Sequence, residues 1–115
     1  MEYNDFTKEW LNAWNNHDLE AIMKHYDDDV EFYSPIVAEI FPETKGHLTG
    51  TAALREYFDK ALSKYPDLHF DLHKCLTGIQ SVVLYYSSVK NLKSAEFMLL
   101  NEKGKVINVR AHYAK

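Results

Sequence analysis

The stretch 94–113 reads SAEFMLLNEKGKVINVRAHY and contains two runs in which side chains of one kind recur at every second position. A period of two is typical of β-strands, because successive side chains point to opposite faces of a sheet. Between the runs, Asn101–Gly104 has the composition of a four-residue hairpin loop, with Gly104 supplying the left-handed position. The stretch therefore predicts an antiparallel strand pair. One face of its second strand should carry Ile107, Val109, Ala111 and Tyr113.

The sequence before this pair predicts two more long strands. Residues 68–73 alternate between apolar and polar side chains, and Val82–Val89 is a continuous β-favouring run. Further upstream, Val30–Ser34 also favours a strand, which must stop at Pro35 because proline cannot donate to a sheet ladder. The preceding Asp27–Asp29 is expected to be a solvated turn.

Helical spacing dominates the first half of the chain. Apolar residues recur every three or four positions over 4–16, 18–26 and 51–65, which predicts three helices. The intervening residues 35–50 are expected to form a loop that contains a short strand. Helices in one block and an antiparallel meander in another indicate an α+β fold, with the helices on one face of the sheet. The length of 115 residues favours one domain over 1–115.

Composition excludes several functional classes. The net charge is −4 and no basic run is present, so we expect no nucleic-acid partner. No stretch approaches 18 apolar residues, so we expect no membrane span. The acidic N-terminal residues do not resemble a signal peptide, and the lone Cys75 is consistent with a reducing compartment, so we expect a cytoplasmic protein. No cofactor motif is apparent.

Three potential metal ligands recur at every second position in the strand predicted over 68–73. His69, Asp71 and His73 alternate along one predicted strand face, and imidazole and carboxylate groups are common metal ligands. A structural site would need a fourth ligand, which the sequence does not assign. We therefore expect a polar outer sheet face and no metal.

The aromatic content suggests a lined interior. Two Trp, eight Tyr and six Phe residues are many for a chain of 115. They can fill a core, line a pocket, or do both at different depths. The residues expected to converge on this interior are Trp14, Phe32, Phe58, Leu62, Phe70, Leu84, Tyr86, Met98, Val109 and Tyr113.

The long strands also carry apolar residues on their second face. Phe97 and Leu99 lie opposite Met98 and Leu100 in the alternation. A sheet face exposed to water is normally polar, so this pattern predicts a homodimer that pairs through the outer face of the sheet.

Three segments resemble the NTF2-like superfamily, and within it the SnoaL-like group that includes ketosteroid isomerase and polyketide cyclases. Residues 10–22, WLNAWNNHDLEAI, resemble its first helix pair; residues 50–58, GTAALREYF, resemble its third helix; and residues 104–113, GKVINVRAHY, resemble its last strand. The resemblance covers almost the whole chain. It implies a curved, mainly antiparallel sheet wrapped around three helices, a deep pocket and homodimers.

The resemblance also implies candidate catalytic positions. Ketosteroid isomerase uses an Asp base together with a Tyr and a protonated Asp that donate hydrogen bonds to an oxyanion. The corresponding positions hold Ser34, Trp10 and Glu96. Glu96 can act as a neutral donor or general acid, and the indole of Trp10 can donate a hydrogen bond. Ser34 cannot abstract a carbon-bound proton unaided near neutral pH, so the chain lacks the usual base.

Two classes of function follow from the resemblance. The first is an isomerase, cyclase or dehydratase that acts on a small apolar or aromatic molecule. The second is a non-catalytic module for ligand binding or dimerisation. The absent base favours the second class, and the aromatic interior argues against a purely structural domain.

Overall fold

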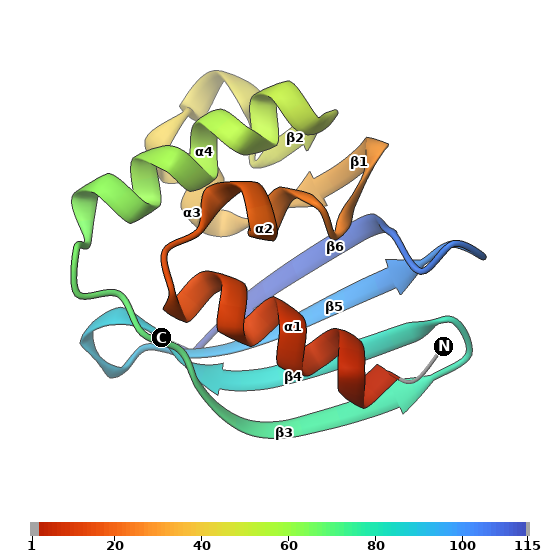
Figure 1. Ribbon diagram of the computed structural model, residues 1–115. Coiled ribbons are helices and arrows are strands. Elements are labelled where there is room, and N and C mark those ends of the chain that lie inside the picture. Colours follow the sequence, from red (N-terminus) through yellow and green to blue (C-terminus); the bar gives the residue numbers. More distant parts are fainter. Residues whose placement is uncertain (1–2, 115) are drawn as a thin grey trace.

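Six strands form one curved sheet in the computed structural model, which describes residues 3–114 (Figure 1). They are β1 (Tyr26–Tyr33), β2 (His47–Thr49), β3 (Asp71–Gly78), β4 (Ser81–Ser87), β5 (Lys93–Leu100) and β6 (Val106–Tyr113). The strand order is β2-β1-β6-β5-β4-β3. All neighbours are antiparallel except β1 and β6, which are parallel. Of the acidic N-terminal stretch, Met1 and Glu2 lie outside the described residues.

The helices cover one face of this sheet. They are α1 (Tyr3–Asn15), α2 (Leu19–Met23), α3 (Pro35–Ile40) and α4 (Thr51–Lys64), with short 3-10 turns η1 (Pro42–Thr44) and η2 (Val89–Asn91). Figure 1 shows α1 running along the sheet in front of β3 to β6, with α2 and α4 toward the β1 end. The predicted α+β fold is therefore confirmed. None of the helices in residues 3–114 is long and apolar enough to span a membrane.

The helix α3 occupies a segment that the sequence predicted as a loop. Ser34 begins it, because the Ser34 hydroxyl accepts a hydrogen bond from the backbone N–H of Ile36 at 3.1 Å. Pro35 follows in the first turn, where the missing N–H costs no hydrogen bond. The same proline that stops the first strand thus starts a helix. The short strand expected in this segment is β2.

The first strand begins four residues earlier than predicted. Tyr26 pairs with Val106 in β6, and the register then shifts before Glu31. Asp27–Asp29 therefore lie in an irregular part of β1 and not in a turn. The Asn101 side chain of the β5–β6 hairpin donates to Asp27 Oδ1 at 3.2 Å, which ties this irregular stretch to the sheet.

A second irregularity changes the predicted face of β6. Leu99 pairs with Asn108, whereas Leu100 pairs with Val106, so Ile107 is an extra residue on β6. A bulge of this kind shifts the side-chain alternation by one position. Val106 therefore takes the buried position that the sequence assigned to Ile107, which is only partly buried.

Side-chain hydrogen bonds hold the segment between α4 and β3 against the end of α1. Asn15 accepts a hydrogen bond from the backbone N–H of Phe70 at 2.7 Å and donates to its carbonyl at 3.1 Å. The His17 ring lies 2.7 Å from the carbonyl oxygen of Leu68. These contacts hold the buried residues Leu68 and Phe70 in place just before β3 begins.

Candidate functional site

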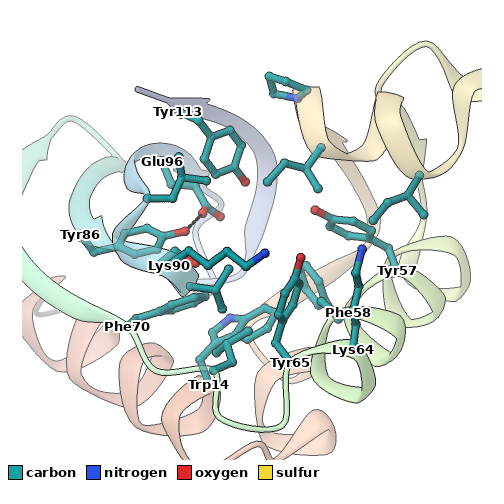
Figure 2. Close-up of a pocket in the computed structure, with 18 of the residues that line it drawn as sticks. Trp14, Tyr57, Phe58, Lys64, Tyr65, Phe70, Tyr86, Lys90, Glu96 and Tyr113 are labelled. Carbon is teal, nitrogen blue, oxygen red and sulfur yellow. Dashed lines mark hydrogen bonds between the residues drawn. The ribbon is translucent and has the colours of Figure 1, made fainter. Parts of the chain in front are cut away.

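A cavity of about 870 Å³ opens between the sheet, α1, the C-terminal half of α4 and the loop between β4 and β5. Aromatic side chains make up much of its wall, and Lys64, Lys90 and Glu96 lie among them (Figure 2). Eight residues that the sequence analysis singled out line it: Trp10, Trp14, Phe32, Phe58, Phe70, Tyr86, Glu96 and Tyr113.

The other residues singled out from the sequence do not line this cavity. Leu84, Met98 and Val109 are completely buried in the layer of core beneath it. Leu62 is only partly buried and packs against the core. Strand alternation predicts which face of the sheet a side chain occupies, but it does not predict how far along the strand the cavity extends. For this reason the sequence analysis grouped these core residues with the cavity wall.

Glu96 is the carboxylic acid in the wall of the cavity. It lies on β5 between Leu84 of β4 and Ala111 of β6, and it is only 5% exposed. Burial raises its pKa to about 7, and the hydrogen bond that Tyr86 donates to Glu96 Oε1 at 2.6 Å opposes the rise. Desolvation disfavours the charged form of a carboxyl. Near neutral pH this group can therefore both give and take a proton.

Tyrosine hydroxyls surround Glu96. Figure 2 shows Tyr86 beside Glu96, and Tyr57 and Tyr113 facing the same space. Burial raises the pKa of all three phenols well above the ordinary value, and the nearby Glu96 carboxyl raises each further. They remain protonated across the physiological range, so they can donate hydrogen bonds to a bound oxygen.

Trp10 lines the cavity with its ring but directs its N–H elsewhere. The indole N–H donates to the hydroxyl oxygen of Tyr26 at 3.0 Å, and both side chains are buried. The ring stacks on Phe70, with centroids 5.6 Å apart, and meets the edge of Tyr86 at 5.7 Å. The structure thus places Trp10 in the aromatic wall, with its donor used inside the protein.

Ser34 lies outside the cavity. It is buried, caps α3 through its hydroxyl, and lines a separate hollow of about 300 Å³, which the ends of β1 and β6 and the start of α3 also line. The Ser34 hydroxyl also lowers the pKa of Tyr57 and of Tyr113 by side-chain hydrogen bonding, against the larger effect of burial. Its position is that of a helix cap and a hydrogen-bond partner of the tyrosines.

Several residues of the cavity were not predicted. Tyr57 lies on α4, and Tyr65 follows the last residue of this helix; both line the cavity. Tyr57 and Phe58 are neighbours on the apolar side of the predicted helix, and this could have indicated a role for Tyr57. The charged and amide side chains of the lining, which carry no periodic signal, were not predicted either: Glu39, Lys60, Lys64, Lys90, Asn91 and Lys93. The other unpredicted lining residues are mostly apolar: Pro35, Ile36, Ile40, Ala61, Leu68, Ser88, Val89, Leu92 and Ala114.

The side chains that suggested a metal site lie at the start of β3, with His69 before the strand and Asp71 and His73 on it. His69 Nδ1 lies 3.4 Å from Asp71 Oδ1, and both side chains are exposed. His73 Nε2 lies 2.7 Å from the Ser87 hydroxyl. No group of three or more His, Cys, Asp or Glu side chains within residues 3–114 is arranged to hold a metal ion.

Comparison with known proteins assigns the fold to a family. The SnoaL-like domain matches residues 7–112 of the chain. The chain belongs to the SnoaL-like family. A solved SnoaL-like protein of unknown function from Burkholderia thailandensis is 37% identical, covers 97% of this chain and 94% of its own, and superposes with a TM-score of 0.92. The chain has no match among curated proteins.

More distant SnoaL-like and NTF2-like structures share the fold alone. An NTF2-like protein of unknown function from Cytophaga hutchinsonii is 17% identical over 99% of this chain and 91% of its own, with a TM-score of 0.78. SalBIII, an epoxide hydrolase/cyclase-like enzyme with a role in pyran ring formation in the polyether salinomycin, is also 17% identical. It covers 96% of this chain and 89% of its own, with a TM-score of 0.78.

Proposed function

We propose that this SnoaL-like protein binds a small apolar or aromatic molecule in the cavity. The observation that carries the proposal is the composition of the wall, in which the Trp14 ring lies 4.7 Å from the ring centroid of Phe58 and 5.2 Å from that of Phe70. An apolar, concave site with a few converging polar groups is the usual form of a small-molecule site. The volume of about 870 Å³ lies within the range of about 300–1,000 Å³ typical of sites for small molecules.

We further propose that Glu96 acts on the bound molecule as a general acid. With a pKa of about 7, its neutral form can donate a proton to a carbonyl or hydroxyl oxygen of the ligand. Protonation of a hydroxyl group lets it leave as water, and protonation of a carbonyl favours enolisation or ring closure. These reactions belong to the dehydratases, isomerases and cyclases. The alternative is a non-catalytic binding module, which the capping role of Ser34 favours because no carboxylate stands at the usual base position.

Binding can be tested by filling the cavity. Ala61 lies on the α4 face that lines the cavity, and Ala61→Trp would occupy that space. We expect the affinity for N-phenyl-1-naphthylamine, a neutral probe that fluoresces in apolar sites, to fall by at least about tenfold, because the aromatic contacts of the probe are lost. Fluorescence titration gives the dissociation constant.

The matched control is Ala52→Trp. Ala52 lies on the same helix but is exposed and outside the cavity. This variant should bind the probe like the native protein. Absence of probe binding by the native protein, or equal binding by both variants, would contradict the proposal.

We also propose that the protein forms a homodimer through the outer face of the sheet. Leu76 and Tyr85 are 58% and 39% exposed on this face, next to the partly buried Val83 and Phe97. Exposed apolar side chains gathered on one face are typical of surfaces that contact another protein.

Sedimentation equilibrium tests this arrangement. At micromolar concentration we expect a species of twice the 13.4 kDa of one chain. Leu76→Glu should shift the equilibrium toward monomer, since a dimer would bury the new charge. Ala52→Glu places the same charge on the exposed side of α4 and should leave the dimer intact. A native protein that sediments only as monomer would refute the dimer.

A further inference from the structure

The mouth of the cavity differs in charge from the rest of the chain. The chain carries a net charge of −4, yet four lysines, Lys60, Lys64, Lys90 and Lys93, line this cavity. Glu39 is the only carboxylate besides Glu96 among the described lining residues. A concave site with one sign of charge concentrates ligands of the opposite sign. The mouth is therefore suited to a negatively charged group.

Two of these lysines, Lys64 and Lys90, make no side-chain hydrogen bond or ion pair within residues 3–114. Lys93 donates to Ser87 and Asn91, and Lys60 lies over the ring of Phe41 at 5.3 Å. Lys64 lies over the ring of Tyr65 at 5.5 Å, and Tyr65 itself lines the cavity, so this contact keeps the amino group beside the cavity wall. The ion pairs within residues 3–114 are His47–Glu31, Arg55–Glu20 and His69–Asp71, so neither Lys64 nor Lys90 has a carboxylate partner there. Figure 2 shows the Lys90 side chain extending into the pocket and the Lys64 amino group turned toward it.

The backbone at Lys90 supports a role for its side chain. Lys90 has a φ of 54° and Asn91 a φ of 60°, so two consecutive residues adopt the left-handed conformation. Asparagine tolerates this conformation, but lysine adopts it only at a cost that glycine would avoid. Strained residues of this kind concentrate at functional sites. Here the strained loop between β4 and β5 presents Lys90 to the cavity mouth.

We propose that the ligand carries an anionic group, a carboxylate or a phosphate, that the amino groups of Lys64 and Lys90 hold at the cavity mouth. This inference rests on the proposed binding function and narrows its ligand class. The apolar body of the ligand lies against the aromatic wall, and an oxygen at its inner end reaches the hydroxyls around Glu96. The ligand is thus an amphipathic acid, with its charge next to solvent.

A matched pair of fluorescent probes tests the inference. 8-Anilinonaphthalene-1-sulfonate differs from N-phenyl-1-naphthylamine only by its sulfonate group. We expect the double variant Lys64→Gln/Lys90→Gln to bind the sulfonate about tenfold more weakly than the native protein, as two partly exposed charge pairs are lost. Its affinity for the neutral probe should stay within about twofold. Added salt should weaken only sulfonate binding, because salt screens exposed charges.

Two further variants separate charge from shape. Lys64→Arg/Lys90→Arg keeps both positive charges and should retain sulfonate affinity. Lys8→Gln/Lys103→Gln removes two exposed lysines that do not line the cavity and should also retain it. We expect 1-naphthoate and 1-naphthyl phosphate to displace the sulfonate probe more effectively than the neutral 1-naphthalenemethanol. The more effective of the two acids then indicates whether the site prefers a carboxylate or a phosphate.

The outcomes distinguish this inference from the proposed function. Unchanged sulfonate affinity in the glutamine double variant, or an equal loss of both probes, would overturn the role of the two lysines while leaving cavity binding in place. Displacement by the neutral alcohol as effective as by the two acids would overturn it as well. Failure of the neutral probe to bind the native protein would instead remove the proposed function itself.

Discussion

Replacing Trp10 with alanine is expected to lower the free energy of unfolding by about 3–5 kcal/mol. The Trp10 side chain is 1% exposed and contacts the rings of Trp14, Phe70 and Tyr86. Its removal enlarges the cavity into the core and leaves the buried Tyr26 hydroxyl without the donor it now has. Urea denaturation followed by circular dichroism measures the loss.

Trp10→Phe is the control for this substitution. It keeps an aromatic ring in the wall and removes the N–H that donates to Tyr26, so we expect a loss of about 1–3 kcal/mol. If the alanine variant were less than about 1 kcal/mol below the native protein, Trp10 would not be a core residue.

Glu96→Gln is expected to remove a pH dependence of about 3 kcal/mol from the stability of the protein. Burial raises the pKa of Glu96 from 4.5 to about 7, so the folded state binds this proton more tightly than the unfolded chain. Each pKa unit corresponds to about 1.4 kcal/mol. Below pH 4.5 the carboxyl is neutral in both the folded and the unfolded protein. As the pH rises from 4.5 to 7, the unfolded chain loses this proton first, so the free energy of unfolding falls.

The measurement is the difference in unfolding free energy between Glu96→Gln and the native protein at several pH values. This difference should move by about 3 kcal/mol in favour of the variant between pH 4.5 and pH 8. Glutamine has nearly the shape of glutamate, and its carbonyl oxygen can still accept the hydrogen bond from Tyr86. Glu56→Gln, on the exposed surface of α4, is the matched control. A difference that is constant across this pH range would show that Glu96 is not desolvated.

The sequence was a good guide where periodicity was regular. The β5 run predicted that Glu96, Met98 and Leu100 share one face, and all three are buried. It was a poor guide where the backbone departs from the repeat. The bulge that shifts Ile107 depends on pairing between two strands, and such pairing leaves no mark on either strand alone. The helix α3 was missed because Pro35 was interpreted only as the end of a strand. Its combination with Ser34 also begins a helix.

The sequence predicted an aromatic cavity, but it did not predict which residues line it at each position. Aromatic content and the resemblance led to the cavity wall, including Glu96 and Tyr113. Whether a side chain lines the cavity or lies in the core depends on how the strands and helices pack together. Leu84 and Tyr86 share one face of β4, so alternation alone did not separate the core residue from the cavity residue. Lys64 and Lys90 lie at a helix end and in a loop, where neither period applies. Only their positions in space place them at the same opening.

The parallel pairing of β1 with β6 constrains when the protein can fold during synthesis. Residues 31–33 of β1 pair with residues 108–110 of β6, so the ribosome makes more than seventy residues between the two partners. Until β6 emerges, β1 has only the three-residue β2 beside it, and an isolated two-strand ribbon is marginal in water. Until then, the first helices have no complete sheet to pack against. Such long-range closure slows folding, and it leaves the aromatic residues of the nascent N-terminal half exposed to the cellular chaperones.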